Sequence, residues 1–187
     1  MTYPGPHAAE ILEDAKEFYV TSTNNSRAII DRGDGPYLYD VDGYKYIDLH
    51  CGAGVTNLGH NHQPSIQAIC ERVQKKGIFH TEHHNAFNPT AIELSKFLAL
   101  NSPVKKPAKV FLSNSGAEAN EAARKACEAY RYHRGEQQTK SRAIYFENGF
   151  AGRTHGVLAA TTSNPTVQRN PYWNHCDQEN SIYLPYP

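Results

Sequence analysis

The chain has 187 residues, of which 39% are hydrophobic and 20% charged, so it can bury a packed core and is not a disordered segment. Its 19 basic residues balance its 19 acidic residues, which leaves no net charge to favour nucleic acid or an anionic membrane as a partner. Without an apolar run as long as a membrane span or a secretory signal, and with only four scattered cysteines, the sequence predicts a cytoplasmic protein.

The first fifty residues predict a helix and then a β-hairpin. Apolar residues recur at helical spacing over residues 7–20. Two strand-like segments, residues 37–41 and 44–48, flank an Asp-Gly pair, which is a signal for a two-residue hairpin turn. In the register that this turn favours, we expect Asp40 to face Lys45 across the two strands.

The next part of the chain predicts a loop and two helices. Residues 51–63 are rich in glycine, asparagine and histidine, and we expect them to form an ordered loop. A helix over residues 64–76 begins with a proline and is closed by Gly77, and a second helix over residues 89–100 also begins with a proline.

From residue 109 onward the pattern becomes that of an α/β fold. We expect strands over residues 110–112, 142–146 and 181–184. A long helix over residues 116–134 and a short one over residues 154–161 separate them. Strands that alternate with helices predict a largely parallel sheet covered on both faces.

The start of the long helix is the most informative segment. A helix that begins directly after a strand presents free N–H groups and its positive dipole end, which suits a phosphate. Gly116 lets an anion approach the backbone closely, and the Ser115 hydroxyl is a further donor. However, Ser115 and Glu118 also fit the S-x-x-E capping box, which is far more common than a phosphate site. A capped helix start and a phosphate site can coexist.

Four segments in the same order resemble those of class III aminotransferases. The segment from Ser113 to Ala123 is similar to their phosphate-loop signature. Residues 38–48 resemble their N-terminal hairpin, residues 59–64 their G-H-x-H-P turn with one extra residue, and residues 146–154 their F-H-G-R-T segment. Members include acetylornithine, ornithine and 4-aminobutyrate aminotransferases, which are fold-type I enzymes that use pyridoxal 5'-phosphate.

The resemblance implies both the fold and its division. We expect the N-terminal part of a fold-type I transferase, with a helix and a hairpin followed by the first part of an α/β large domain. Residues 1–50 would form the N-terminal segment of the small domain. Residues 51–187 would form the first part of the cofactor-binding large domain, incomplete at its C-terminal end.

The resemblance also implies the roles of particular residues. Ser115, Gly116 and Ala117 would bind the cofactor phosphate, and Phe150 would stack on the pyridine ring. Arg153 would pair with a substrate carboxylate, as a guanidinium group suits a carboxylate. The residue after Phe150 is alanine, where the family usually has histidine or another large side chain, so the substrate cannot be assigned from the motif.

The implied function is that of an aminotransferase, a cytoplasmic homodimer that moves an amino group between an amino acid or omega-amine and a 2-oxo acid. None of the ten lysines of this chain lies in the context of the family's Schiff-base lysine. We therefore expect these 187 residues alone to be inactive and to be an incomplete piece of a longer enzyme. The alternative is a non-catalytic truncated paralogue that pairs with a full-length aminotransferase.

Two other interpretations fit the sequence less well. A flavodoxin-like phosphate binder would have no use for the segment from Phe150 to Arg153. A metal site is the second, because histidines and one cysteine recur between residues 51 and 84, but their spacing matches no standard zinc signature, so we expect no metal. The residues concerned are Cys51, His60, His62, His80, His83 and His84.

Overall fold

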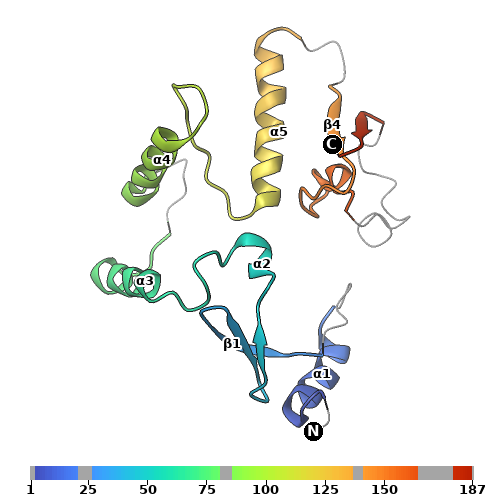
Figure 1. Cartoon of the computed structure of the whole chain (residues 1–187). Coiled ribbons are helices and arrows are strands. Elements are labelled where there is room, and N and C mark those ends of the chain that lie inside the picture. The colour runs from blue at the N-terminus through green and yellow to red at the C-terminus, as the bar shows by residue number, and fades with distance from the viewer. Residues whose placement is uncertain (1–2, 21–26, 81–85, 137–140, 164–178, 187) are drawn as a thin grey trace. The chain divides into compact units, whose positions relative to one another are not determined.

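The computed structural model describes residues 3–20, 27–80, 86–136, 141–163 and 179–186 (Figure 1). The chain divides into two compact units, residues 1–80 and 81–187. The first unit contains α1 (Pro6–Phe18), β1 (Ile30–Asp34), β2 (Tyr37–Asp40), β3 (Lys45–Ile47), α2 (Cys51–Gly54) and α3 (Gln63–Lys76). The second contains α4 (Pro89–Asn101), α5 (Gly116–His133), β4 (Ala143–Phe146), the 3-10 turn η1 (Leu158–Ala160) and β5 (Ser181–Leu184). The assignment of residues 1–50 and 51–187 to a small and a large domain stays a prediction.

The first unit contains a three-stranded antiparallel sheet in the order β1-β2-β3. The predicted hairpin is present, but its predicted register was wrong by one residue, because Lys45 faces Tyr39 and not Asp40. The sequence did not predict β1, which pairs with β2 through an irregularity near Ile30. The loop between β2 and β3 is therefore longer than the two residues that its Asp-Gly pair suggests.

The carboxylate of Asp40 determines this longer loop. Asp40 is 4% exposed. It accepts hydrogen bonds from the N–H groups of Asp42 (3.1 Å) and Tyr44 (2.8 Å) and from the Tyr46 hydroxyl (2.7 Å). Burial acts to raise the pKa of Asp40, but these hydrogen bonds outweigh burial and lower it. The ionised side chain thus accepts hydrogen bonds from the N–H groups of Asp42 and Tyr44. In a tight two-residue turn, the N–H group of residue 44 would be free to pair with the opposite strand.

A second carboxylate in the same loop, that of Asp42, caps α1. The residue before this helix is Gly5, which has no side chain to cap it. The Asp42 carboxylate instead accepts hydrogen bonds from the N–H groups of His7 (3.0 Å) and Ala8 (2.9 Å). A Cβ atom on Gly5 would lie 2.3 Å from Asp42 Cγ, so only glycine fits there. One side chain therefore attaches the helix to the hairpin loop.

The loop predicted at residues 51–63 runs from residue 48 to residue 62 and contains the short α2, and Gln63 already belongs to α3. Asp48 accepts hydrogen bonds from the N–H groups of His50 (2.9 Å) and Cys51 (3.0 Å) and lies 2.7 Å from His60 Nε2. The hydrogen bond to His60 is the largest cause of the lowered pKa of Asp48. An antiparallel bridge between Gly35 and His60 attaches the loop to the sheet. These contacts make the loop a fixed part of the first unit.

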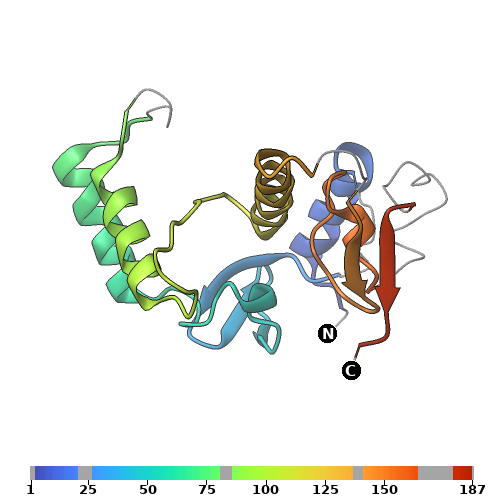
Figure 2. The same cartoon turned by 90° about the horizontal axis from the view of Figure 1, so that it is seen from above.

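In the second unit, β4 and β5 pair in parallel, with Ala143 opposite Ser181 (Figure 2). This confirms the predicted strands and their direction, and α5 is the predicted long helix. The strand predicted at residues 110–112 was wrong, because this segment belongs to no strand in the described part of the chain. A strand needs a hydrogen-bonded neighbour, and the two described strands of this unit pair with each other.

The predicted helix over residues 154–161 was wrong except for one 3-10 turn, η1. Its residues supply most of the small buried core. Leu158 and Ala159 are buried against Tyr145, and the Tyr183 hydroxyl donates to the Ala159 carbonyl at 2.9 Å. The two threonines that follow η1 bond to the preceding backbone: Thr161 accepts from the Ala151 N–H, and Thr162 donates to the Phe146 carbonyl at the end of β4. The chain turns back there and the helix stops.

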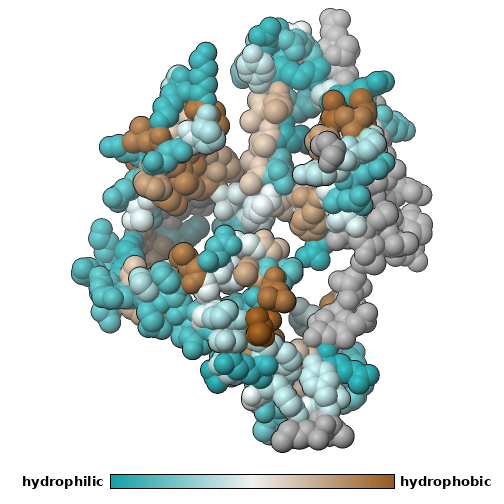
Figure 3. All heavy atoms as spheres, viewed as in Figure 1, coloured by the Kyte–Doolittle hydropathy of each residue, from teal (hydrophilic) through white to brown (hydrophobic). Residues whose placement is uncertain are grey.

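The helix α4 is apolar around most of its surface and exposed in the described part of the chain. Figure 3 shows apolar side chains gathered over it. A helix of this kind is typical of the interior of a larger fold. Its exposed apolar residues are Ile92, Leu94, Phe97, Leu98 and Leu100. No helix among the described residues is long and apolar enough to cross a membrane.

The Asp42 cap gives a test of the first unit. We expect Asp42→Ala to lower the free energy of unfolding by about 1 kcal/mol, because two helix N–H groups lose their acceptor. Urea denaturation followed by circular dichroism measures this change. Asp31→Ala is the matched control, since Asp31 is exposed on β1. Equal stability of the two variants would contradict the capping role.

Candidate functional site

The start of α5 is a capped helix terminus. Ser115 is the residue before the helix, and its backbone is extended, with φ −153° and ψ 162°. Its hydroxyl oxygen accepts a hydrogen bond from the Glu118 N–H at 3.2 Å. The Glu118 carboxylate accepts one from the Asn114 N–H at 2.7 Å. The capping interpretation is therefore confirmed, with the glutamate reaching one residue further back than in the usual box.

Capping leaves two donors of this terminus unused. The N–H groups of Gly116 and Ala117 have no hydrogen-bond partner among the described residues. The first N–H groups of a helix have no acceptor within the helix, and its dipole makes this end positive. The capped start therefore still offers two backbone donors to an anion, so the two interpretations of this segment are compatible.

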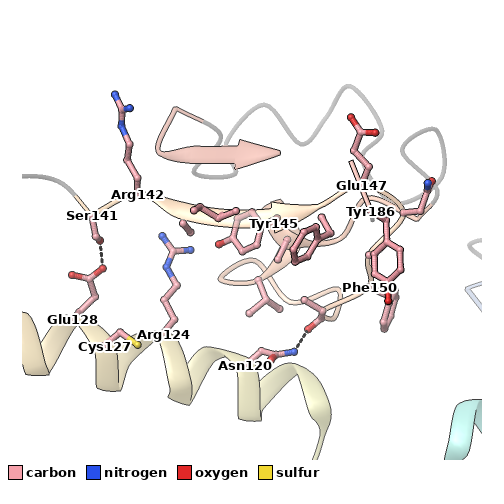
Figure 4. Close-up of a pocket in the computed structure, with 18 of the residues that line it drawn as sticks. Asn120, Arg124, Cys127, Glu128, Ser141, Arg142, Tyr145, Glu147, Phe150 and Tyr186 are labelled. Carbon is pink, nitrogen blue, oxygen red and sulfur yellow. Dashed lines mark hydrogen bonds between the residues drawn. The ribbon is translucent and has the colours of Figure 1, made fainter. Parts of the chain in front are cut away.

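The loop over residues 149–156 lies along the first turns of α5. The Asn120 side chain donates a hydrogen bond to the Ala151 carbonyl at 2.9 Å (Figure 4). Two further contacts continue along the helix: the Thr154 hydroxyl donates to the Glu121 carboxylate, and Arg124 donates to the Gly156 carbonyl at 3.1 Å. Neighbouring positions on one helix face thus hold the loop that carries the predicted ring-stacking and cationic residues.

The loop can approach α5 so closely only because residue 152 is glycine. Its φ is +124°, in a region that side chains disfavour. A Cβ atom there would lie 2.5 Å from the Ala117 Cβ atom and 2.9 Å from the Ala117 Cα atom. Because Ala117 is also one of the two residues with an unused N–H group, this contact places the loop directly beside the helix terminus.

All five predicted binding residues line one cavity in the second unit, with a volume of about 550 Å³. Ser115, Gly116 and Ala117 come from the helix start, and Phe150 and Arg153 come from the loop. Phe150 is 60% exposed. Four further residues complete the lining: Asn120, Ala151, Gly152 and Thr154.

The charge of this cavity favours an anion. Arg153 is the sole charged residue in its lining. The Arg153 guanidinium forms no ion pair with any described residue. The positive end of α5 adds to this charge. No carboxylate of a described residue lines the cavity. The two nearest in sequence, those of Glu118 and Glu121, accept hydrogen bonds from the Asn114 N–H and the Thr154 hydroxyl beside it. A phosphate or carboxylate group suits the lining itself, where the one charge is positive.

A larger cavity of about 810 Å³ lies next to this one, between α5 and β4 (Figure 4). Asn120, Phe150 and Ala151 line both cavities. Its other walls are largely apolar and include Tyr145 and Ile144 of β4. Phe150 and Ala151 of the loop therefore form a boundary that the cavity at the helix terminus shares with the cavity along the helix.

The histidines of the first unit do not form a metal centre in the described residues. His60 Nε2 lies against Asp48, and His62 Nδ1 lies 2.8 Å from the Ser65 hydroxyl. No group of three or more histidine, cysteine or acidic side chains among the described residues is close enough to hold a metal. His83 and His84 lie outside the described residues.

Comparison with known proteins identifies the family of this chain. The family model described as aminotransferase class-III matches residues 18–187. The chain belongs to the class III aminotransferase family. Its predicted fold is confirmed as well, because transaminases of fold type I are its structural neighbours.

Three relatives show how far the match to class III enzymes extends. A probable mitochondrial acetylornithine aminotransferase from Schizosaccharomyces pombe is 39% identical over 74% of this chain and 31% of that protein. An isoleucine 2-epimerase from Lentilactobacillus buchneri is 31% identical over 96% of this chain and 38% of that protein. The crystal structure of the omega transaminase from Pseudomonas jessenii in complex with PMP matches with a TM-score of 0.78 and 28% sequence identity. The match covers 94% of this chain and 39% of that protein. This class III chain spans about a third of the length of its curated relatives.

The sequence analysis did not single out three residues at or beside this candidate site: Asn120, Gly152 and Thr161. Asn120 lies within the signature segment but looks like an ordinary helix surface residue. Gly152 is part of the F-x-G-R-T pattern, and its role follows only from its contact with Ala117. Thr161 lies outside every motif, although it is fully buried and bonds to the loop. Of the three, only Gly152 carries a sequence signal, as a glycine between two residues with predicted roles, Phe150 and Arg153.

The contact between Gly152 and Ala117 gives a second test. We expect Gly152→Ala to lower the free energy of unfolding by about 1–3 kcal/mol, because the new methyl group meets Ala117 and the backbone is strained. Gly135→Ala is the matched control, since Gly135 also has a positive φ of +74° but nothing near its Cβ position. Urea denaturation of both variants measures the difference. Equal losses would show that the Ala117 contact contributes nothing.

Proposed function

We propose that this chain binds pyridoxal 5'-phosphate in the cavity at the start of α5. The chain would be part of an aminotransferase that moves an amino group between an amino acid or omega-amine and a 2-oxo acid. The observation that carries the proposal is the convergence on one cavity of two unpartnered N–H groups, an exposed phenyl ring and an unpaired guanidinium group. The names of the acetylornithine aminotransferase relatives support the reaction class.

The residues at the helix start fit the phosphate of the cofactor. The N–H groups of Gly116 and Ala117 would donate to phosphate oxygens, with the Ser115 hydroxyl as a third donor. Hydrogen bonds to a charged group contribute about 1.5–3 kcal/mol each, so two or three of them suffice to bind the phosphate group specifically. A Cβ atom at residue 116 would meet nothing within 4 Å, so there is open space beside this donor.

The residues of the loop fit the ring and the substrate. The exposed face of Phe150 would stack on the flat pyridine ring, which orients it and excludes water from one side. Arg153 would hold a substrate carboxylate by paired hydrogen bonds. The bound cofactor supplies the electron sink for amino-group transfer, and the protein supplies binding and orientation.

No lysine lines this cavity among the described residues. We propose that these 187 residues bind the cofactor without a covalent bond and do not by themselves complete a turnover. The same lining suits the alternative, a non-catalytic chain that pairs with a full-length aminotransferase. Amino-group transfer by the purified chain would contradict both forms of this proposal.

For the whole enzyme we propose a homodimer, as the family resemblance implies. A cytoplasmic location stays a prediction. The name of the Schizosaccharomyces pombe relative places that protein in mitochondria, so the location is not common to all relatives.

Removal of the Gly116 N–H group tests whether the start of α5 binds the phosphate. Gly116→Pro deletes this donor, and proline is tolerated at the first position of a helix. The preceding Ser115 already has the extended backbone that proline requires. Pyridoxamine 5'-phosphate is a suitable probe because it has no aldehyde that reacts with surface lysines. We expect the variant to bind this probe and inorganic phosphate about tenfold more weakly, with an unchanged circular dichroism spectrum.

Gly116→Ala is the matched control, because it keeps the N–H group and its Cβ atom enters open space. Isothermal titration of both variants separates loss of the donor from added bulk. If Gly116→Pro binds both probes as tightly as Gly116→Ala, the N–H group does not contact the phosphate.

A further inference from the structure

The backbone that joins the proposed ring-stacking residue to the proposed cation is fixed at three consecutive peptide groups. The Ala151 N–H donates to the Thr161 hydroxyl oxygen at 3.0 Å. The Ala151 carbonyl accepts from the Asn120 side chain at 2.9 Å. The Gly152 carbonyl accepts from the Thr161 hydroxyl at 2.5 Å. Since these groups lie in succession along the chain, the two side chains together restrict the dihedral angles of the whole segment.

Thr161 holds this loop segment from a buried position. It is 0% exposed and lines neither of the two cavities beside the loop. Its hydroxyl both accepts from the Ala151 N–H and donates to the Gly152 carbonyl. It therefore has no proton left to offer a ligand, and its influence on the site passes through the loop.

Asn120 holds the same loop segment from the side of α5. It lies one turn after the two unpartnered N–H groups, and its side chain reaches a residue 31 positions further along the chain (Figure 4). The helix that presents the phosphate donors thus also holds the loop that presents the ring. Phosphate donors and ring are therefore kept in one spatial relation.

We infer that Thr161, together with Asn120, is a positioning residue that sets the orientation of the Phe150 ring relative to Arg153 and to the phosphate donors of α5. This inference rests on the proposed function and adds to it how the ring is held. Neither residue carries the charge or the aromatic face proposed to contact the ligand. Thr161 lines neither cavity, and Asn120 lines both but donates from its side-chain amide to the Ala151 carbonyl. Their loss should therefore affect binding of the ring and leave binding of the phosphate group unchanged.

Two probes separate these effects in the purified 187-residue chain. Inorganic phosphate reports the helix terminus alone, whereas pyridoxamine 5'-phosphate reports the terminus and the ring contact together. We expect Thr161→Val, which keeps the shape and removes the hydroxyl, to lower the affinity for pyridoxamine 5'-phosphate about fivefold, the size of one stacking contact. Its affinity for inorganic phosphate should stay at the wild-type value. Thr161→Ser keeps the hydroxyl and should retain the wild-type ratio of the two affinities.

The outcomes distinguish this inference from the proposed function. A wild-type chain that binds neither probe contradicts the proposed function and the inference with it. If the wild type binds both probes and Thr161→Val changes the two affinities by the same factor, or not at all, Thr161 is merely structural and the inference alone is overturned.

A second variant keeps the test valid if Thr161→Val does not fold. Asn120→Ala removes the hydrogen bond to the Ala151 carbonyl from the helix side, where Asn120 is exposed. We expect the same selective loss of affinity for pyridoxamine 5'-phosphate. An unchanged ratio of the two affinities in this variant overturns the inference.

Discussion

The contact between Gly152 and Ala117 is the constraint on which the rest of the site depends. It brings a loop from beyond β4 against the first turn of α5, at a distance that no side chain on residue 152 would allow. Because of this contact, an aromatic ring and a guanidinium group lie beside two unused backbone donors. Hydrogen bonds from Asn120 and Arg124 then hold the loop along the helix. A larger residue at 152 would leave the same side chains present but apart.

The helix terminus serves stability and binding at the same time. Ser115 and Glu118 satisfy two N–H groups and so stabilise the start of the helix. The N–H groups of Gly116 and Ala117 lie between these two, remain unused among the described residues, and are those that an anion can reach. Capping residues fix the direction of these donors, and Arg153 adds the charge that makes the cavity attractive to phosphate or carboxylate groups.

The parts of the fold that depend on local interactions could be predicted from the sequence, and the parts that depend on distant partners could not. The capped start of α5 follows from two residues three positions apart, Ser115 and Glu118, and it was predicted. The register of β2 and β3 depends on the buried Asp40 carboxylate, which takes up the turn donors, and it was predicted wrongly. Residues 110–112 have strand composition but no strand neighbour in the described chain. At the site, Phe150 and Arg153 came from the family resemblance, whereas Thr161 acts through a buried hydroxyl that has no sequence signature.

The central claim is that the cofactor phosphate is held by the backbone at the start of α5. Amide chemical shifts of the ¹⁵N-labelled chain during titration with pyridoxamine 5'-phosphate test it most directly, because they report on the donors themselves. The account predicts that the N–H resonances of Gly116 and Ala117 show the largest shifts, and that inorganic phosphate moves the same two resonances. Binding of the probe with these two resonances unmoved would contradict the claim.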